Sequence, residues 1–127
     1  MKLKVCGMRE TKNITALANL QPDYMGFIFW EPSQRYCTTV PSDIPKTIKK
    51  VGVFVDETTE QIKEKVKLFG LDAVQLHGDE SPSQCAALLS SCEVIKAFRL
   101  FMSRIPVFLY SSLCVCIRCC TNRSRIS

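Results

Sequence analysis

The side chains best suited to chemistry follow successive short apolar runs of this chain. Cys6 ends the first run, Arg35 lies in the loop after the second, and Asp56 follows the third. Gln75 and His77 lie at the end of the fourth. In a protein built on parallel strands, the carboxyl ends of the strands meet at one rim. A thiol, a guanidinium, a carboxylate and an imidazole on one rim suit an anionic small substrate.

Each of these residues also has a structural interpretation. A free cysteine is commonly a small buried hydrophobe, so Cys6 could belong to the core. His77, the single histidine of the chain, could hydrogen-bond to a loop carbonyl. Residue type and spacing alone leave both interpretations open.

Five short segments have the character of buried strands. Each is about five or six residues long, the usual length of a strand. They are nearly continuous in apolar residues, as strands buried on both faces should be. The expected strands cover residues 2–6, 24–29, 50–55, 72–77 and 93–98.

Helical patterns fill the intervals between these strands. The clearest follows Thr58, which with Gln61 forms a capping box, and it ends at Gly70. The last begins at Ser81 as the N-cap, with Gln84 expected to complete a second box. The first, over residues 11–19, is shorter but consistent. The second, over residues 41–50, is weak, with a single turn as the alternative to a helix.

Strands that alternate with helices predict βαβ units and a parallel sheet. Two architectures share this pattern, an open doubly wound sheet and the eight-stranded (β/α) barrel. The open dinucleotide-binding sheet lacks its glycine fingerprint, because the first strand is followed by Cys6-Gly7-Met8-Arg9. The barrel lacks strands, because five units are found where eight are required.

Four motifs in order carry a family resemblance. Over about residues 1–98 the chain closely resembles the N-terminal half of phosphoribosylanthranilate isomerase, an enzyme of tryptophan biosynthesis. The motifs are Lys4-Val5-Cys6-Gly7-Met8-Arg9, Met25-Gly26-Phe27-Ile28-Phe29 with Pro32-Ser33-Gln34-Arg35-Tyr36, Val51-Gly52-Val53-Phe54-Val55, and Val74-Gln75-Leu76-His77-Gly78-Asp79-Glu80.

The resemblance implies an α/β fold of the (β/α)8 TIM-barrel family, here a truncated barrel with about five βα units and an atypical tail. It implies an Amadori rearrangement of N-(5-phosphoribosyl)anthranilate to 1-(2-carboxyphenylamino)-1-deoxyribulose 5-phosphate, with no metal and no organic cofactor. Cys6 matches the family's general base, and Arg35 matches the arginine that holds the anthranilate carboxylate. Gln75 and His77 match strand positions that face the substrate, and Asp56 is a weaker candidate at the same rim.

The resemblance ends after residue 98, which divides the chain into a partial barrel, residues 1–98, and a non-matching tail, residues 99–127. Residues 101–127 contain no Asp, Glu, His or Gly, so they offer neither the family's acidic strand end nor a glycine-rich phosphate loop. Translation out of frame, or disorder, is the favoured explanation of this Cys-, Arg- and Ser-rich tail. A metal or redox cluster built on Cys114, Cys116, Cys119 and Cys120 is the alternative, although the spacing fits no single zinc pattern.

An unfinished barrel leaves unpaired strand edges, so we expect little or no isomerase activity from this chain alone and self-association through those edges. A non-catalytic half-barrel that serves only as an assembly partner is the alternative function, and a different enzyme on a related half-barrel is another.

Charge and cysteine content limit the remaining partners and the location. Residues 1–100 carry 13 basic and 12 acidic side chains, a net of +1, and the tail adds four Arg, so no nucleic-acid surface is expected. No run approaches the ~20 apolar residues of a membrane span. Scattered cysteines behind a start without a secretory signal predict a cytoplasmic protein with free thiols.

Overall fold

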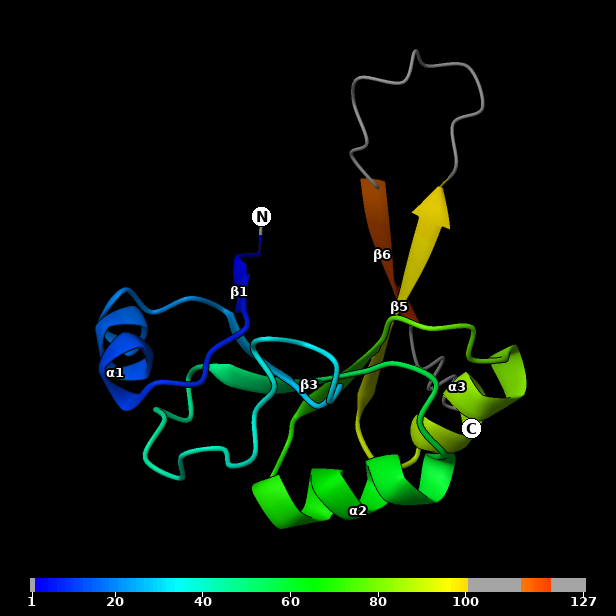
Figure 1. Ribbon diagram of the computed structural model, residues 1–127, viewed down its shortest axis with the longest axis horizontal. Coiled ribbons are helices and arrows are strands. Elements are labelled where there is room, and N and C mark those ends of the chain that lie inside the picture. The colour runs from blue at the N-terminus through cyan, green and yellow to red at the C-terminus, as the bar shows by residue number, and fades with distance from the viewer. Residues whose placement is uncertain (1, 101–112, 120–127) are drawn as a thin grey trace, which may run out of the picture.

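The computed structural model describes residues 2–100 and 113–119, which form one sheet with three helices (Figure 1). The order along the chain is β1 (Lys4–Cys6), α1 (Thr11–Asn19), β2 (Tyr24–Ile28), β3 (Lys49–Phe54), α2 (Thr59–Phe69), β4 (Ala73–Leu76), α3 (Pro82–Leu88), β5 (Glu93–Leu100) and β6 (Leu113–Cys119). The strands lie in the sheet in the order in which they occur in the chain.

The first five strands are parallel, which confirms the predicted half-barrel. All five predicted strands are present, with bounds that differ from the expected ones by a few residues at most. The weak second helix does not form, and turns and bends connect β2 to β3. The five parallel strands of the sheet are therefore consecutive barrel units, as the alternation of elements predicted.

The sixth strand was not anticipated by the strand pattern. β6 pairs antiparallel with β5, from Val94 opposite Cys119 to Leu100 opposite Leu113, and the two strands extend together beyond the rest of the sheet (Figure 1). Cys114, Cys116 and Cys119 of the suggested cysteine cluster belong to this strand, whereas Cys120 lies outside the described residues.

The helix caps form largely as the sequence predicts. Thr58 accepts from the backbone N–H of Gln61, whose side chain accepts in return, and Gly70 ends α2 with φ of 58°. The prediction of a second capping box is wrong for one of its two hydrogen bonds. Ser81 accepts from the Gln84 backbone, but the Gln84 side-chain amide donates to the carbonyl of Glu57 at 2.6 Å. Gln84 thus joins two loops instead of closing its own helix start.

The register divides the parallel strands into two faces. One face packs against the helices in the main core, whose sheet members are Met25, Phe27, Phe54, Val74, Leu76 and Val94. The other face has a smaller apolar cluster of Tyr24, Val51 and Ala73, with Ile95 against it. Because Cys6 pairs with Gly26, and the register continues through Val51 to Ala73, Cys6 belongs to this second face.

Candidate functional site

Cys6 is the last residue of β1 and lies half-buried over the neighbouring strand. Its Sγ is only 2.8 Å from the position that a Cβ on Gly26 would occupy. The backbone N–H groups of Gly7 and Met8 both donate to the Gly26 carbonyl, at 3.0 and 3.1 Å. The chain turns at Gly7, where φ is +82°, a conformation that suits glycine. Gly26 on β2 therefore makes room for the thiol, and Gly7, just after β1, makes room for the turn.

Arg35 reaches the same place from the loop that follows β2. The loop is held by hydrogen bonds from Cys37 N–H to the Ile28 carbonyl at 2.8 Å and from Arg35 N–H to Ser33 Oγ at 3.2 Å. A Cβ on Gly7 would lie 2.9 Å from Arg35 Cδ and 3.0 Å from its Nη1. The Arg35 side chain thus lies directly against the residue that follows the thiol.

Gln75 lies on β4 on the same face of the sheet as Cys6 and is 7% exposed. Its side-chain Oε1 accepts from Lys4 Nζ on β1. Lys4 and Gln75 are 71 residues apart in the chain, so the two strands approach each other across this face. The sequence did not single out Lys4, because a lysine in an edge strand resembles an ordinary solvated residue.

His77 follows β4 directly and continues its ladder, since its backbone N–H donates to the Phe54 carbonyl at 2.9 Å. The residue is half-buried at the same end of the sheet. Cys6, Gln75 and His77 therefore come from the ends of two strands that point the same way, as the rim prediction requires.

Asp56 also lies at this end of the sheet, but its carboxylate is engaged with the neighbouring loop. Its Oδ1 accepts from the Asp79 backbone N–H at 2.7 Å, and its own N–H donates to Glu80 Oε1 at 3.0 Å. Its φ is +52°. The structure therefore gives Asp56 a role in joining the β3–α2 and β4–α3 loops.

Glu80 and Lys96 are two further polar residues at this end of the sheet that the sequence analysis missed. Lys96 Nζ lies 2.6 Å from Glu80 Oε2, and the two side chains are 9% and 0% exposed. The sequence alone does not reveal this ion pair, because the two residues come together only in the folded chain. Sixteen positions separate them in the chain, with no shared motif.

Two other thiols, Cys92 and Cys37, are placed differently from Cys6. Burial, followed by the nearby Glu93 carboxylate, raises the pKa of Cys92 from 9.0 to about 11. Burial also raises the pKa of the Cys37 thiol, whose Sγ lies 2.8 Å from the Thr39 carbonyl oxygen. Both thiols hold their protons more firmly than an exposed cysteine. Cys37 belongs to the main core on the helix-covered face, and Cys92 packs against that core.

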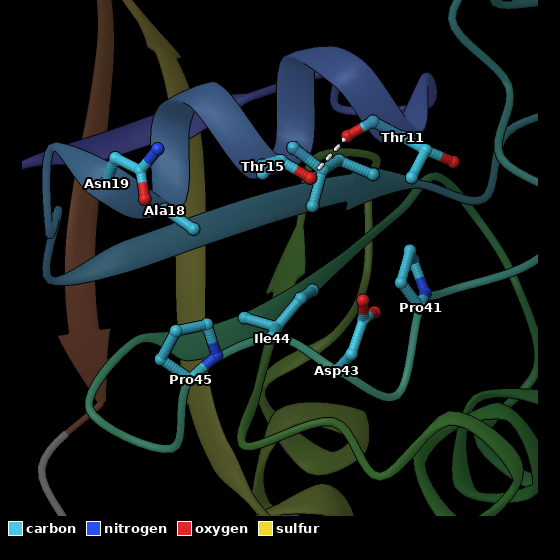
Figure 2. Close-up of a pocket in the computed structure, with 9 residues that line it drawn as sticks. Thr11, Thr15, Ala18, Asn19, Pro41, Asp43, Ile44 and Pro45 are labelled. Carbon is cyan, nitrogen blue, oxygen red and sulfur yellow. Dashed lines mark hydrogen bonds between the residues drawn. The ribbon is translucent and has the colours of Figure 1, made fainter.

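A small pocket lies elsewhere, between α1 and the loop before β3 (Figure 2). It has a volume of about 180 Å³ and is lined by Thr11, Ile14, Thr15, Ala18, Asn19, Pro41, Asp43, Ile44 and Pro45. In Figure 2 the dashed line joins the Thr15 hydroxyl to the Thr11 carbonyl, a bond of 3.0 Å within the helix. None of the five predicted site residues lines this pocket.

Residues 2–100 and 113–119 contain no group of three or more His, Cys, Asp or Glu side chains placed to hold a metal ion. Within the same part of the chain, no helix is both long and apolar enough to cross a membrane.

Comparison with known proteins gives one consistent family. Residues 3–104 match the family model described as N-(5'phosphoribosyl)anthranilate (PRA) isomerase. A curated relative of that name from Phocaeicola vulgatus is 46% identical over 101 residues, which cover 79% of this chain and 49% of the relative. Another, from Parabacteroides distasonis, is 39% identical and is covered to 60%, with 90% of this chain aligned. The chain thus spans about half the length of the curated relatives it matches.

Solved structures agree with the sequence relatives. The phosphoribosyl anthranilate isomerase of Thermotoga maritima is 33% identical, with a TM-score of 0.66 over 76% of this chain and 49% of that one. The enzyme of Thermus thermophilus is 29% identical, with a TM-score of 0.71 over 79% and 52%. A third structure, 31% identical with a TM-score of 0.67 over 76% and 52%, contains reduced 1-(o-carboxyphenylamino)-1-deoxyribulose 5-phosphate.

Proposed function

The chain belongs to the N-(5'-phosphoribosyl)anthranilate isomerase family, and on that basis we propose that its half-barrel carries the base and the carboxylate-binding arginine of an Amadori rearrangement. The substrate is N-(5'-phosphoribosyl)anthranilate, and the product is 1-(2-carboxyphenylamino)-1-deoxyribulose 5-phosphate. The reaction moves protons within one molecule and adds or removes no atoms.

The rearrangement needs an acid and a base at different steps. Protonation of the furanose ring oxygen opens the ring to a Schiff base. The Cys6 thiolate then takes the proton from sugar C2, and the electron pair of that C–H bond forms the enolamine. Protonation at C1, with loss of the proton from the C2 hydroxyl, gives the ketone. A positioned base contributes to such a step by holding its acceptor atom within reach of the proton.

Arg35 is proposed to bind the anthranilate carboxylate. A guanidinium presents two parallel N–H donors to a carboxylate, which fixes the plane of the bound ring as well as its charge. The observation that supports the proposal most directly is the packing of Arg35 against Gly7, because the guanidinium then lies beside the residue that follows Cys6. Gln75 and His77 are proposed to face the sugar from β4, with Asp56 at the edge of the same rim.

The general acid is not among these residues. Residues 101–127 contain no Asp, Glu or His, and they contain no glycine for a phosphate loop. We therefore propose that this polypeptide alone binds the anthranilate end of the substrate but has little or no isomerase activity. No cofactor is needed for the proton transfers, and the free thiols of Cys6, Cys37, Cys85 and Cys92 fit action in the reducing cytoplasm.

Self-association through the β1 edge is the partner interaction proposed here. β1 has only three residues and, in the part of the chain that the structure describes, pairs with β2 alone. An edge with open backbone N–H and carbonyl groups can accept a strand from a second copy. Sedimentation velocity over a hundredfold concentration range tests this. We expect dimer at high concentration, and a monomer at every concentration would refute it.

Binding of the reduced product analogue tests the site itself. Isothermal titration should show binding to the parent chain. Arg35→Met should weaken it at least tenfold, about 1.4 kcal/mol, because a charge-assisted hydrogen bond is lost. Lys46→Met, which removes the same charge from an exposed loop position, should leave the affinity unchanged. Equal affinity for Arg35→Met and the parent, or no binding by the parent, would contradict the proposal.

A further inference from the structure

The Glu80–Lys96 pair is the most deeply buried charged group in the described chain that the proposed reaction does not use. Its side chains are 0% and 9% exposed, and Lys96 Nζ lies 2.6 Å from Glu80 Oε2. Removing two charges from water offsets much of the attraction between them, so a buried pair is weak grounds for a purely stabilising role. The other hydrogen bonds of these two side chains are therefore a better guide to their role than the ion pair itself.

Both side chains form hydrogen bonds with the backbone of the loop after β4. Glu80 Oε1 accepts from the N–H of Gly78 at 3.1 Å, and Lys96 Nζ donates to the Gly78 carbonyl at 2.5 Å. Glu80 Oε1 also accepts from Asp56 N–H at 3.0 Å. Through one ion pair, β5 is thus joined to the loops that follow β3 and β4.

The loop position that they fix is adjacent to the rim. His77 N–H donates to the Phe54 carbonyl on one side, and Gly78 is held from both of its backbone polar groups on the other. Asp79 N–H donates to Asp56 Oδ1 at 2.7 Å. A side chain at position 78 would overlap the Asp56 carboxylate, so the loop has little freedom to shift.

We propose that Glu80 and Lys96, here called the loop latch, are positioning residues that hold His77 and the carboxyl end of β4 at the rim. This inference rests on the proposed function in one respect only, that Gln75 and His77 face the substrate. The latch residues do not touch the substrate. They act by fixing the backbone from which those two side chains project.

Hydrogen exchange measured by mass spectrometry tests the latch without any substrate. In Glu80→Gln, exchange in peptides that contain residues 77–80 should be at least tenfold faster than in the parent, while α1 peptides keep their rate. Lys49→Met is the matched control, because the Lys49–Glu93 pair at 3.1 Å lies at the opposite end of β5. It should leave residues 77–80 unchanged.

The single histidine supplies a second, local readout. In untagged protein, carbethoxylation of His77, followed at 240 nm, should be at least twofold faster in Glu80→Gln than in the parent or in Lys49→Met. If Glu80→Gln does not fold, the double variant Glu80→Gln/Lys96→Met decides, since it removes the ion pair without leaving one charge buried and unpaired. Unchanged exchange and reactivity at residues 77–80, or a uniform rise over the whole chain, would overturn the inference.

Titration with the reduced product analogue separates this inference from the proposed function. A positioning role predicts that folded Glu80→Gln binds the analogue at least threefold more weakly than the parent, whereas Lys49→Met does not. If the parent itself does not bind, the proposed function fails, and the exchange and carbethoxylation results still decide the latch.

Discussion

Gly26→Ala is the substitution for which the structure makes the sharpest prediction. A Cβ at this position would lie 2.8 Å from Cys6 Sγ, 3.1 Å from Cys6 Cα and 3.2 Å from Cys6 Cβ. The thiol could rotate away, but the Cα belongs to the backbone of β1. The added methyl group must therefore displace the strand that carries the proposed base, and not only its side chain.

The expected loss of stability follows from two opposing effects. Overpacking of a well-fitted site costs about 1–3 kcal/mol, whereas replacing a strand glycine with alanine gains roughly 0.5–1 kcal/mol in backbone entropy. The net loss is then roughly 0–2.5 kcal/mol. Because a backbone atom is among the close contacts, we expect a value of about 1–2 kcal/mol. β1 pairs with β2 alone among the described strands, so the displacement should occur at this edge.

Urea unfolding and amide exchange measure the two parts of this prediction. The single tryptophan, Trp30, reports unfolding by fluorescence. Exchange at Gly7 and Met8 should accelerate, because both N–H groups donate to the Gly26 carbonyl. Gly52→Ala is the matched control. Its Cβ would meet the side-chain ends of Leu71 and Phe54 at 2.7 Å, on the face covered by helices.

The control should lower stability without loosening the turn after β1. If Gly26→Ala is as stable as the parent and leaves exchange at Gly7 and Met8 unchanged, the packing of the thiol against β2 is not as described. The same conclusion follows if Gly52→Ala accelerates exchange at those two amides equally.

Substitutions at three further positions test other parts of the structure. Thr58→Ala should cost about 1 kcal/mol in urea unfolding, because it removes the cap of α2, and Thr58→Ser should retain most of the stability. Lys96→Met should cost about 3–5 kcal/mol by leaving the Glu80 carboxylate buried and unpaired; a loss below 1 kcal/mol would show that the pair is open to water. Cys92, with a folded pKa of about 11 against an ordinary 9.0, favours the folded state below pH 9, and this contribution is lost between pH 9 and 11. Cys92→Ala should therefore lose less stability than the parent over that interval, and identical pH profiles would count against the raised pKa.

The sequence was sufficient to predict the parallel strands and most of the helix caps, because both depend on local patterns of residues. Short, nearly continuous apolar runs are typical of strands in a parallel sheet that is covered on both faces, and β2 and β4 are indeed almost fully buried. A capping box depends on residues three positions apart, such as Thr58 and Gln61, so it can be recognised from the local sequence. The strand-end rule likewise placed Cys6 and His77 at the same end of the sheet.

Contacts between distant residues were beyond the sequence patterns. Gln84 has the spacing of a capping box, yet its amide is drawn to a carbonyl of another loop 27 residues away. Lys4 and Gln75 meet only because β1 and β4 face each other across the sheet. β6 was missed because its partner, β5, is antiparallel to it, and the barrel pattern predicts parallel neighbours only.

Gly7 combines a requirement of the backbone with a requirement of the proposed anion site. Its positive φ disfavours any side chain, and the space that a side chain would fill holds the Arg35 aliphatic stem and guanidinium. Consider a variant in which Gly7 is replaced, under genetic selection for function. A shorter residue at position 35 would relieve the clash with the new side chain, but it would also remove the group proposed to bind the carboxylate. The backbone strain at position 7 would persist. We therefore expect substitutions of Gly7 to have no single-site suppressor at position 35, which makes this glycine a more stringent marker of a functional copy than Cys6 alone.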